Sequence, residues 1–251
     1  MCLHEATADK VVSGEIRSGG CWECLLSRLM MTILLTHRNA TFVDIGANVG
    51  SHTLAMAASG AAQHVHAFEA APRNLLLLDE SVRLNKLDSR VTLYAAALGA
   101  RSGLVRLGRT FNANEGNIRN SERAGGVQLP RVALDSILDP IAQPVFVKVD
   151  IEGAECAALH GARKFMYHSR IVGFAIEIFQ SRACCAEWCA SDGLFHGLKA
   201  RGLCVYSIVE RPPKLTPLDM TRCTNWCSNT PRANPQIYDI VFVPCNVHIK
   251  A

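Results

Sequence analysis

Short apolar runs alternate with longer amphipathic segments along most of this chain, a pattern typical of strands that alternate with helices. The apolar runs predict strands at residues 42–45, 65–70, 91–98, 145–149 and 172–179. Apolar residues at helical spacing predict helices at residues 50–60, 72–86, 154–168 and 187–201. Two later runs, at residues 205–209 and 238–243, are expected to pair antiparallel and to close the sheet. The alternation indicates a largely parallel sheet with helices on both faces.

The regular pattern loosens between residues 101 and 131, which are polar and rich in glycine. A short strand is expected at residues 104–107, followed by the irregular stretch RTFNANEGNIRN. An insertion of this length in a compact domain is more often functional than idle. We expect residues 1–40 to form a helical extension, and residues 41–251 to form one domain.

The segment TFVDIGANVGSHT, residues 41–53, reads as a buried strand that ends in an acid and a glycine turn and then becomes a helix. Gly46 allows the chain to reverse tightly, and Gly50 lets the helix approach the sheet. Asn48 stands where a third glycine is common, and asparagine tolerates the left-handed backbone that such a turn needs. This architecture builds a nucleotide pocket at the N-terminus of the helix.

Two acidic residues indicate which nucleotide the pocket takes. Asp44, at the strand end, would repel the pyrophosphate of a dinucleotide, whereas S-adenosylmethionine (SAM) brings an ammonium and a sulfonium and no phosphate. Glu69 lies 19 residues beyond Gly50, at the end of the predicted second strand. An acid there can accept hydrogen bonds from both ribose hydroxyls. The spacing therefore predicts a SAM site.

Five motifs make the chain resemble the FkbM family of class I SAM-dependent methyltransferases. They are VDIGANVGSHT (43–53), AFEAAPRNLLLL (67–78), LNKLDSRVTLYAAALGARSG (84–103), LDSIL (134–138) and VKVDIEGAECAALHGA (147–162). The last, with the spacing K-x-D-x-E-G-x-E, is the most specific to the family. The family more often has proline where Ala70 or Ala71 stands and an asparagine shortly before the alanines at 95–97, and neither change removes a charged contact.

The resemblance implies a fold and an activity. The expected fold is a doubly wound, mostly parallel, seven-stranded Rossmann-like sheet with an antiparallel C-terminal strand. The implied activity is SAM-dependent O-methylation of a hydroxyl on a sugar, glycan or small metabolite. We predict donor contacts from the turn and its helix, from the acid after the second strand and from the later alanine run. The residues concerned are Asp44, Gly46, Ala47, Asn48, Gly50, His52, Thr53, Glu69 and Ala96.

Methyl transfer from a sulfonium mainly requires alignment of donor and acceptor, and a hydroxyl acceptor must also lose a proton. Asp150 and Glu152 follow the predicted fourth strand and Glu177 lies near the end of the fifth, so we predict these three as catalytic residues. Lys148 is expected on the same side of its strand as Asp150, beside the substrate. The same carboxylates suit a hard divalent cation, although no metal is predicted. In the alternative interpretation Glu152 and Glu155 only charge the first turn of the next helix, and Glu177 pairs with an arginine.

His52 and His66 are more simply side chains that line or pack beside the donor than general bases. Asn112, Asn114, Glu115 and Asn117 offer short polar groups suited to a sugar or polyol, and we predict the three asparagines as substrate-binding. A solvated turn is an equally good interpretation of this run. Six arginines lie between Arg101 and Arg131 and suit an anionic ligand, but acidic residues between them favour a solvated loop.

The net charge is only +4, which disfavours nucleic acid as a partner. The longest apolar run is too short to span a bilayer and the N-terminus lacks a secretory pattern, so a soluble, cytoplasmic protein is predicted. Eleven cysteines include the clusters Cys21/Cys24, Cys184/Cys185/Cys189 and Cys223/Cys227. Zinc or disulfides would explain these clusters, but free thiols in a reducing compartment are the expectation.

Two other classes of function stay open. The chain would be a binding module if it kept the nucleotide pocket and had lost catalysis, or it would methylate RNA or protein through the arginines of residues 101–131. Methyltransferases that act on nucleobase or glutamine nitrogens usually carry an Asn/Asp-Pro-Pro-aromatic turn after the fourth strand. This chain has VDIEG there, which disfavours chemistry on amino groups. The sequence carries no signal for the acceptor or for an oligomeric state.

Overall fold

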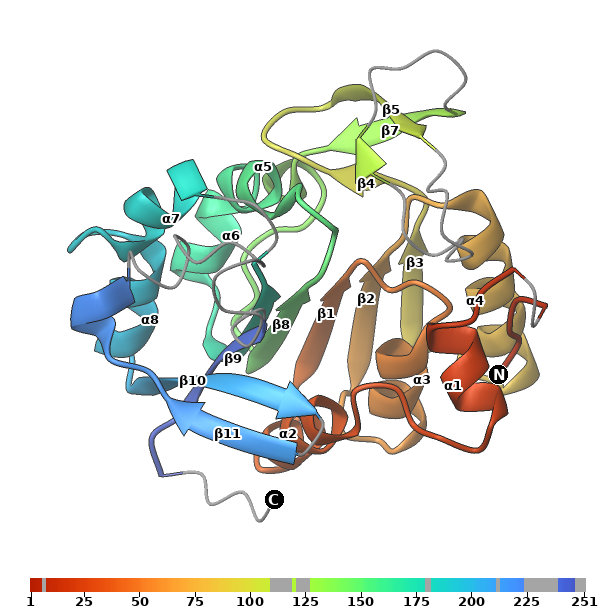
Figure 1. The fold of residues 1–251 in the computed structure, drawn as a ribbon, viewed down its shortest axis with the longest axis horizontal. Coiled ribbons are helices and arrows are strands. Elements are labelled where there is room, and N and C mark those ends of the chain that lie inside the picture. Colours follow the sequence, from red (N-terminus) through yellow and green to blue (C-terminus); the bar gives the residue numbers. More distant parts are fainter. Residues whose placement is uncertain are drawn as a thin grey trace.

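The computed structural model describes residues 1–5, 8–108, 119–120, 127–178, 182–210, 213–223 and 239–246. Its centre is one twisted sheet with helices packed around it, and a smaller sheet lies beyond one end of the central strands (Figure 1). The glycine turn and the acidic strand ends predicted to carry function lie at the end of the central strands that faces the smaller sheet.

The central sheet has eight strands in the order β11-β10-β12-β9-β8-β1-β2-β3. They are β1 (Thr41–Ile45), β2 (His64–Phe68), β3 (Val91–Tyr94), β8 (Val145–Val149), β9 (Ile171–Glu177), β10 (Leu203–Glu210), β11 (Pro213–Pro217) and β12 (Asp239–Pro244). The run from β3 to β9 is parallel. β12 is antiparallel to β9 and to β10, which confirms the predicted antiparallel pair.

The predicted count of seven strands is wrong by one, because β11 adds an antiparallel edge strand against β10. Its sequence PKLTP begins and ends with proline, which lacks the N–H that a central strand needs. An edge strand tolerates proline. The two prolines of this segment therefore disfavour a strand in the sequence, but a strand at the edge of the sheet can accommodate them.

Helices cover both faces of the sheet, and the strands are buried on both sides. Phe42 of β1 packs with α2 (Cys24–Leu35), α3 (Ser51–Ala58) and α4 (Pro72–Leu84). Val43 and Ile45, the alternate side chains of the same strand, pack with α5 (Glu155–His160), α6 (Arg163–His168) and α8 (Leu194–Ala200). Burial on both faces explains why these strands read as continuous apolar runs. Within the described ranges, no helix has both the length and the apolar character needed to cross a bilayer.

Two predicted helices are each divided. The segment 154–168 forms α5 and α6, which are separated at Gly161. A Cβ at this position would stand 2.0 Å from the backbone oxygen of Gly99, so only glycine permits this close approach of the two backbones. The last predicted helix, residues 187–201, is replaced by α7 (Arg182–Cys189) and α8.

The smaller sheet is built largely from the region in which the sequence pattern loosens. Its order is β4-β7-β5-β6, with β4 (Ala97–Leu98), β5 (Gly103–Gly108), β6 (Arg119–Asn120) and β7 (Val127–Val132). The predicted strand 91–98 is therefore two strands in two sheets, and the short strand predicted at 104–107 is part of β5. Of the predicted loop, residues 109–118 and 121–126 lie outside the described residues.

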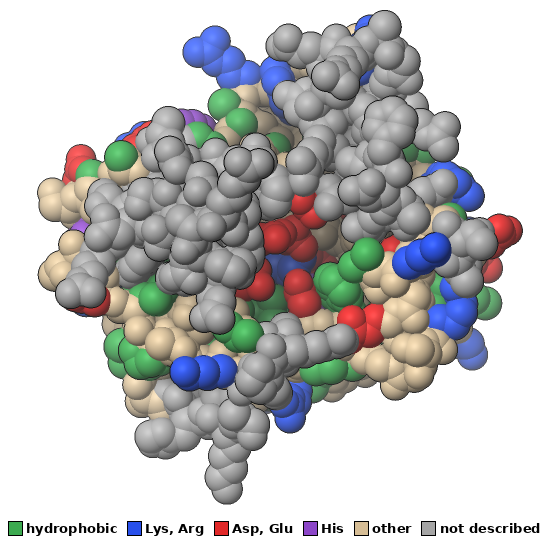
Figure 2. Space-filling model, viewed as in Figure 1, with side chains coloured by type: hydrophobic (Ala, Val, Ile, Leu, Met, Phe, Trp, Pro, Cys, Tyr) green, Lys and Arg blue, Asp and Glu red, His purple; other side chains and the backbone are tan. Residues whose placement is uncertain are grey.

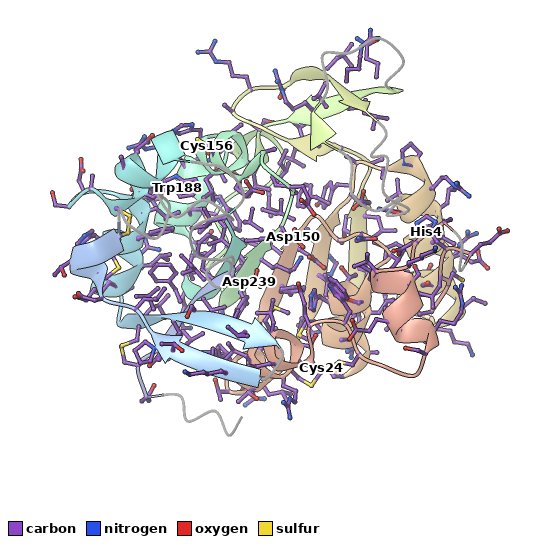
Figure 3. All side chains as sticks on the ribbon, in the orientation of Figure 1. His4, Cys24, Asp150, Cys156, Trp188 and Asp239 are labelled. Atoms are coloured by element: carbon purple, nitrogen blue, oxygen red, sulfur yellow. A yellow bond between two sulfur atoms is a disulfide. The ribbon has the colours of Figure 1, made fainter. Side chains whose placement is uncertain are left out.

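Several cysteines are joined in disulfides, so the prediction of free thiols is wrong for them (Figure 3). Cys189 at the end of α7 bonds to Cys223, and Cys204 of β10 bonds to Cys245. Cys21 bonds to Cys24 at the start of α2, and Cys156 is also disulfide-bonded. The two longer pairs join positions 34 and 41 residues apart, and adjacency of β10 and β12 brings the second pair together.

Reduction of the Cys189–Cys223 and Cys204–Cys245 bonds is expected to lower the free energy of unfolding by about 2 to 4 kcal/mol for each bond, because each closes a long loop in the unfolded chain. Chemical denaturation with and without a reductant measures the loss, and peptide mapping of unreduced protein should recover both pairs. Stoichiometric reaction of these thiols in the folded, unreduced protein would contradict the pairing. Since such bonds persist in oxidising compartments, confirmation would also count against the predicted cytoplasmic location.

Candidate active site

A cavity of about 570 Å³ opens at the carboxyl ends of β1, β2, β8 and β9. Ligand pockets occur at this edge of open α/β sheets. In the space-filling view, acidic side chains surround a hollow with a basic side chain within it (Figure 2). The predicted residues that line the cavity are Gly46, Ala47, Asn48, His52, Glu69, Ala96, Lys148, Asp150, Glu152 and Glu177.

The glycine turn is held by backbone bonds to the neighbouring strands. The amides of Gly46 and Ala47 both donate to the carbonyl of Phe68, at 3.0 Å each. Gly46 has a φ of 88° and Asn48 a φ of 52°, so the expectation that Asn48 adopts a left-handed backbone is confirmed. The turn thereby presents its backbone to the cavity at the N-terminus of α3.

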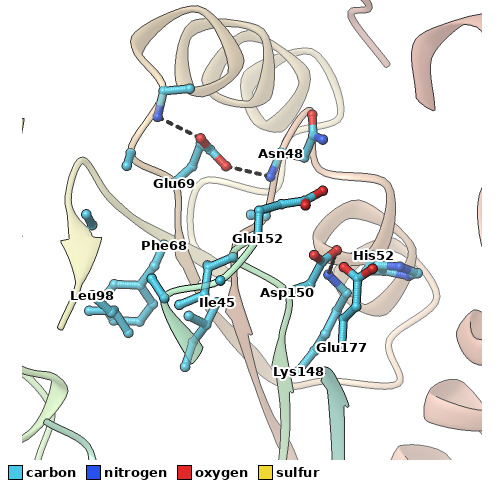
Figure 4. Close-up of a pocket in the computed structure, with 18 of the residues that line it drawn as sticks. Ile45, Asn48, His52, Phe68, Glu69, Leu98, Lys148, Asp150, Glu152 and Glu177 are labelled. Carbon is cyan, nitrogen blue, oxygen red and sulfur yellow. Dashed lines mark hydrogen bonds and ion pairs between the residues drawn. The ribbon is translucent and has the colours of Figure 1, made fainter. Parts of the chain in front are cut away.

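Glu69 binds the turn as well as lining the cavity. One carboxylate oxygen accepts from the amide of Asn48 at 2.8 Å and the other from the amide of Ala71 at 2.7 Å (Figure 4). A carboxylate offers about four lone-pair positions, so it keeps acceptor capacity for a ligand beside these amides and the Asn74 side chain. Burial raises the pKa of the Glu69 carboxyl to about 7, although the two amides and the Asn74 side chain oppose that shift.

Lys148 lies beneath the other end of the cavity and is only 4% exposed. Its Nζ donates to Asp150 Oδ2 at 3.1 Å, which confirms that the two side chains share one side of the strand. Asp44 Oδ1 lies 4.0 Å from the same Nζ. Burial alone would lower the pKa of Lys148, but the carboxylates of Asp150, Asp44 and Glu23 raise it, so this side chain remains an ammonium.

Asp150 and Glu177 face each other in this acidic end, and their pKa values move apart. Burial would raise the pKa of Asp150, but the Lys148 ammonium and a hydrogen bond from Glu177 hold it below its usual range. Burial and the neighbouring Asp150 carboxylate raise the pKa of Glu177 far above its usual range. Asp150 is therefore the ionised member of the pair and Glu177 the protonated one. The alternative in which Glu177 pairs with an arginine is not what the described contacts show.

Carboxylate oxygens of Asp150, Glu152 and Glu177 lie within 4.8 Å of one another, close enough to hold a cation. The Lys148 ammonium, 3.1 Å from Asp150 Oδ2, already compensates the negative charge of Asp150. Glu155, by contrast, accepts from the amide of Gly153 at 2.7 Å and so serves the start of α5. The absence of a metal stays a prediction.

His52 has both ring nitrogens engaged by the N-terminal segment. Its Nε2 lies 2.7 Å from Glu23 Oε2 and its Nδ1 2.9 Å from Ser27 Oγ. A ring held in this way is a connection between α3 and α2, not a free base. Val11, Val12, Trp22 and Glu23 also line the cavity, as does Arg131. Sequence reasoning missed the four residues of the N-terminal segment, since nothing in residues 1–40 signals that they fold back over the turn.

Other predicted residues are placed elsewhere. Asp44, Gly50 and Thr53 are absent from the described cavity lining: Asp44 is buried and accepts a 2.7 Å hydrogen bond from Thr53 Oγ1 beneath the turn. His66 packs against Tyr94, with its Nδ1 3.0 Å from the phenol oxygen. Asn112, Asn114 and Asn117, like Glu115, lie outside the described residues, so their predicted contact with substrate stays a prediction.

Three solved structures are partly similar to this chain. A methyltransferase FkbM from Methylobacillus flagellatus is 20% identical with a TM-score of 0.49, over 82% of this chain and 44% of that one. A precorrin-6y C5,15-methyltransferase from Geobacter metallireducens is 13% identical (TM-score 0.42, 87% of each chain). A SAM-dependent O-methyltransferase from Thermotoga maritima is also 13% identical (TM-score 0.41, 89% of this chain and 66% of that one). The chain thus spans less than half the length of the first of these proteins.

No curated protein matches the chain significantly. The family model for the methyltransferase FkbM domain matches residues 44–183. That range contains the glycine turn, Glu69 and the Lys148–Asp150 pair, and it ends beyond Glu177. Because the match covers more than half of the 251 residues, the chain belongs to the FkbM methyltransferase family.

Proposed function

We propose that this protein transfers the methyl group of SAM to a hydroxyl of a sugar, a glycan or another small metabolite. The observation that carries the proposal is the continuity of one cavity, in which Glu69 and the glycine turn line one end and Lys148, Asp150 and Glu177 line the other. Membership of the FkbM family supports methyl transfer.

The first end suits the nucleoside part of the donor. The Glu69 carboxylate is fixed by two amides and retains lone pairs for the ribose hydroxyls. Apolar Ile45, Phe68 and Leu98 line the cavity nearby and suit an adenine ring. When bound, SAM would supply an activated methyl group with a good leaving group.

The other end suits the acceptor. Asp150 is ionised and within reach of the cavity, so it would accept the hydroxyl proton during or after transfer. Lys148 holds that carboxylate at 3.1 Å and keeps it anionic. The protonated Glu177 would donate a hydrogen bond to Asp150 or to an acceptor oxygen.

Binding of S-adenosylhomocysteine (SAH), the demethylated product, is expected to weaken as pH falls below about 7, because the Glu69 carboxyl then becomes protonated. A raised pKa means that the ionised acceptor is present only above that pH. The affinity should drop by up to about tenfold per pH unit between pH 7 and pH 5. Calorimetric titration across this range measures the change. Glu69→Gln, which cannot ionise, should bind more weakly at pH 8 and show a flat profile; an unaltered profile in that variant would remove Glu69 from the site.

The proposed reaction is tested with SAM that carries a labelled methyl group. The acceptors would be neutral sugars and glycosides, small hydroxylated metabolites, RNA and a protein mixture, with SAH calorimetry on the same preparation. Label in a base-stable ether on a sugar or metabolite supports the proposal. Label in RNA or protein, or tight SAH binding without transfer to any acceptor, would favour one of the other two functions. A protein that binds neither SAM nor SAH would overturn the donor site itself.

A further inference from the structure

The N-terminal segment forms part of the cavity wall although it lies outside the residues that define the family. Trp22 and Glu23 line the cavity, whereas the family match begins at residue 44. Both residues lie between Cys21 and Cys24, which are joined in a disulfide at the start of α2. This wall is therefore a feature of this chain that the family domain by itself does not supply.

Glu23 is held in place from two directions. Its backbone is left-handed, with a φ of 46°, which is uncommon for a residue other than glycine, asparagine or aspartate. A residue keeps such a conformation when its surroundings enforce it. Here the disulfide closes the turn around it, and the 2.7 Å bond to His52 Nε2 fixes the carboxylate. Ser27, one turn further along α2, holds His52 Nδ1.

Glu23 faces the acidic end of the cavity. A small adjoining pocket is lined by Glu23 together with Lys148, Asp150 and Glu177. The charge of Glu23 reaches Lys148, where it helps to keep the ammonium protonated. Among the described residues, the carboxylates of Asp150, Asp44 and Glu23 thus surround a single ammonium, that of Lys148. The local electrostatic field therefore favours an added positive charge.

We propose that Glu23 selects the cationic donor SAM over the neutral-sulfur product SAH, an inference that rests on the proposed function. During transfer, the bond from sulfur to the methyl carbon breaks and its electron pair stays on sulfur. A lone pair of the acceptor hydroxyl forms the new carbon–oxygen bond, and the hydroxyl proton passes to Asp150. The sulfur thereby loses its positive charge, so Glu23 attracts the donor more strongly than the product and favours exchange of SAH for SAM.

Calorimetric titration of SAM and SAH into wild type and Glu23→Gln tests this inference without any acceptor. Glutamine keeps an oxygen that accepts from His52 Nε2 and removes only the charge. The ratio of the SAH to the SAM dissociation constant should fall by about threefold to tenfold in the variant, the scale expected for removal of one charge from the cavity wall. The matched control is Glu80→Gln on α4, which removes an exposed charge outside the cavity and should leave the ratio unchanged.

Each outcome is decisive. An unchanged ratio in Glu23→Gln overturns the inference, and so does an equal loss of affinity for both ligands, which would assign Glu23 only to docking the N-terminal segment. A ratio that falls equally in Glu80→Gln also overturns it, because the effect would then be one of net charge. If the wild type binds neither ligand, the proposed function itself fails, which is distinct from SAM and SAH binding with an unaffected ratio.

Discussion

Asp150→Asn protein is expected to transfer methyl groups about 100-fold or more slowly than the wild type, with little change in SAH affinity. Asp150 is the ionised carboxylate of its pair and lies at the end of the cavity away from Glu69. Asparagine preserves the shape and still offers an oxygen to Lys148, but it cannot take the acceptor proton. The measurement is the initial rate with the acceptor that the labelled-methyl screen identifies, beside SAH calorimetry on the same sample.

A matched control for this variant is Asp139→Asn, the same chemical change at an exposed side chain that pairs with Lys164. It should turn over at the wild-type rate. If Asp150→Asn also turns over normally, Asp150 only compensates Lys148. A joint loss of rate and SAH affinity would instead assign Asp150 to the donor site.

Gly46→Ala is expected to lower the free energy of unfolding by about 4 kcal/mol or more and to abolish SAH binding, because two costs coincide at this position. The backbone has a φ of 88°, which disfavours any side chain. A Cβ would also stand 1.8 Å from the backbone oxygen of Asp150, so the turn after β1 or the end of β8 must move. Denaturant unfolding and SAH calorimetry measure the two effects.

Gly202→Ala separates these costs. Gly202 has nearly the same φ, 86°, but a Cβ there meets nothing within 4 Å. In this variant only the left-handed backbone should lower the free energy of unfolding, by about 1 to 2 kcal/mol, and SAH should bind normally. Equal destabilisation by the two substitutions would show that the close approach to Asp150 does not matter.

The contact between Gly46 and Asp150 also explains why two distant motifs form one site. The glycine turn follows β1 and Asp150 follows β8, and these strands are parallel neighbours in register from Thr41 to Ile45. A change in the turn therefore displaces the Asp150 backbone directly. Donor binding and proton acceptance are coupled by this backbone packing.

The sequence by itself determined the centre of the fold and one end of the site. β1, β8 and α4 lie where the apolar pattern predicts them. Asn48 has a left-handed backbone, as its residue type predicts, and Lys148 contacts Asp150, as the spacing of the two residues predicts. These features depend on neighbours in the chain, on the two-residue period of a strand and on the allowed backbone of single residues, all of which the sequence states directly.

Only the tertiary structure decided which distant residues share the cavity. Glu23 meets His52 across 29 residues at the wall of the cavity, and, away from the cavity, Cys204 bonds to Cys245. Neither pairing has a local signal: a glutamate in an N-terminal extension and a cysteine read alike whether or not a partner lies opposite. Which partner lies opposite follows from strand order and helix packing, which bring these segments together only once the apolar faces of the whole chain are buried.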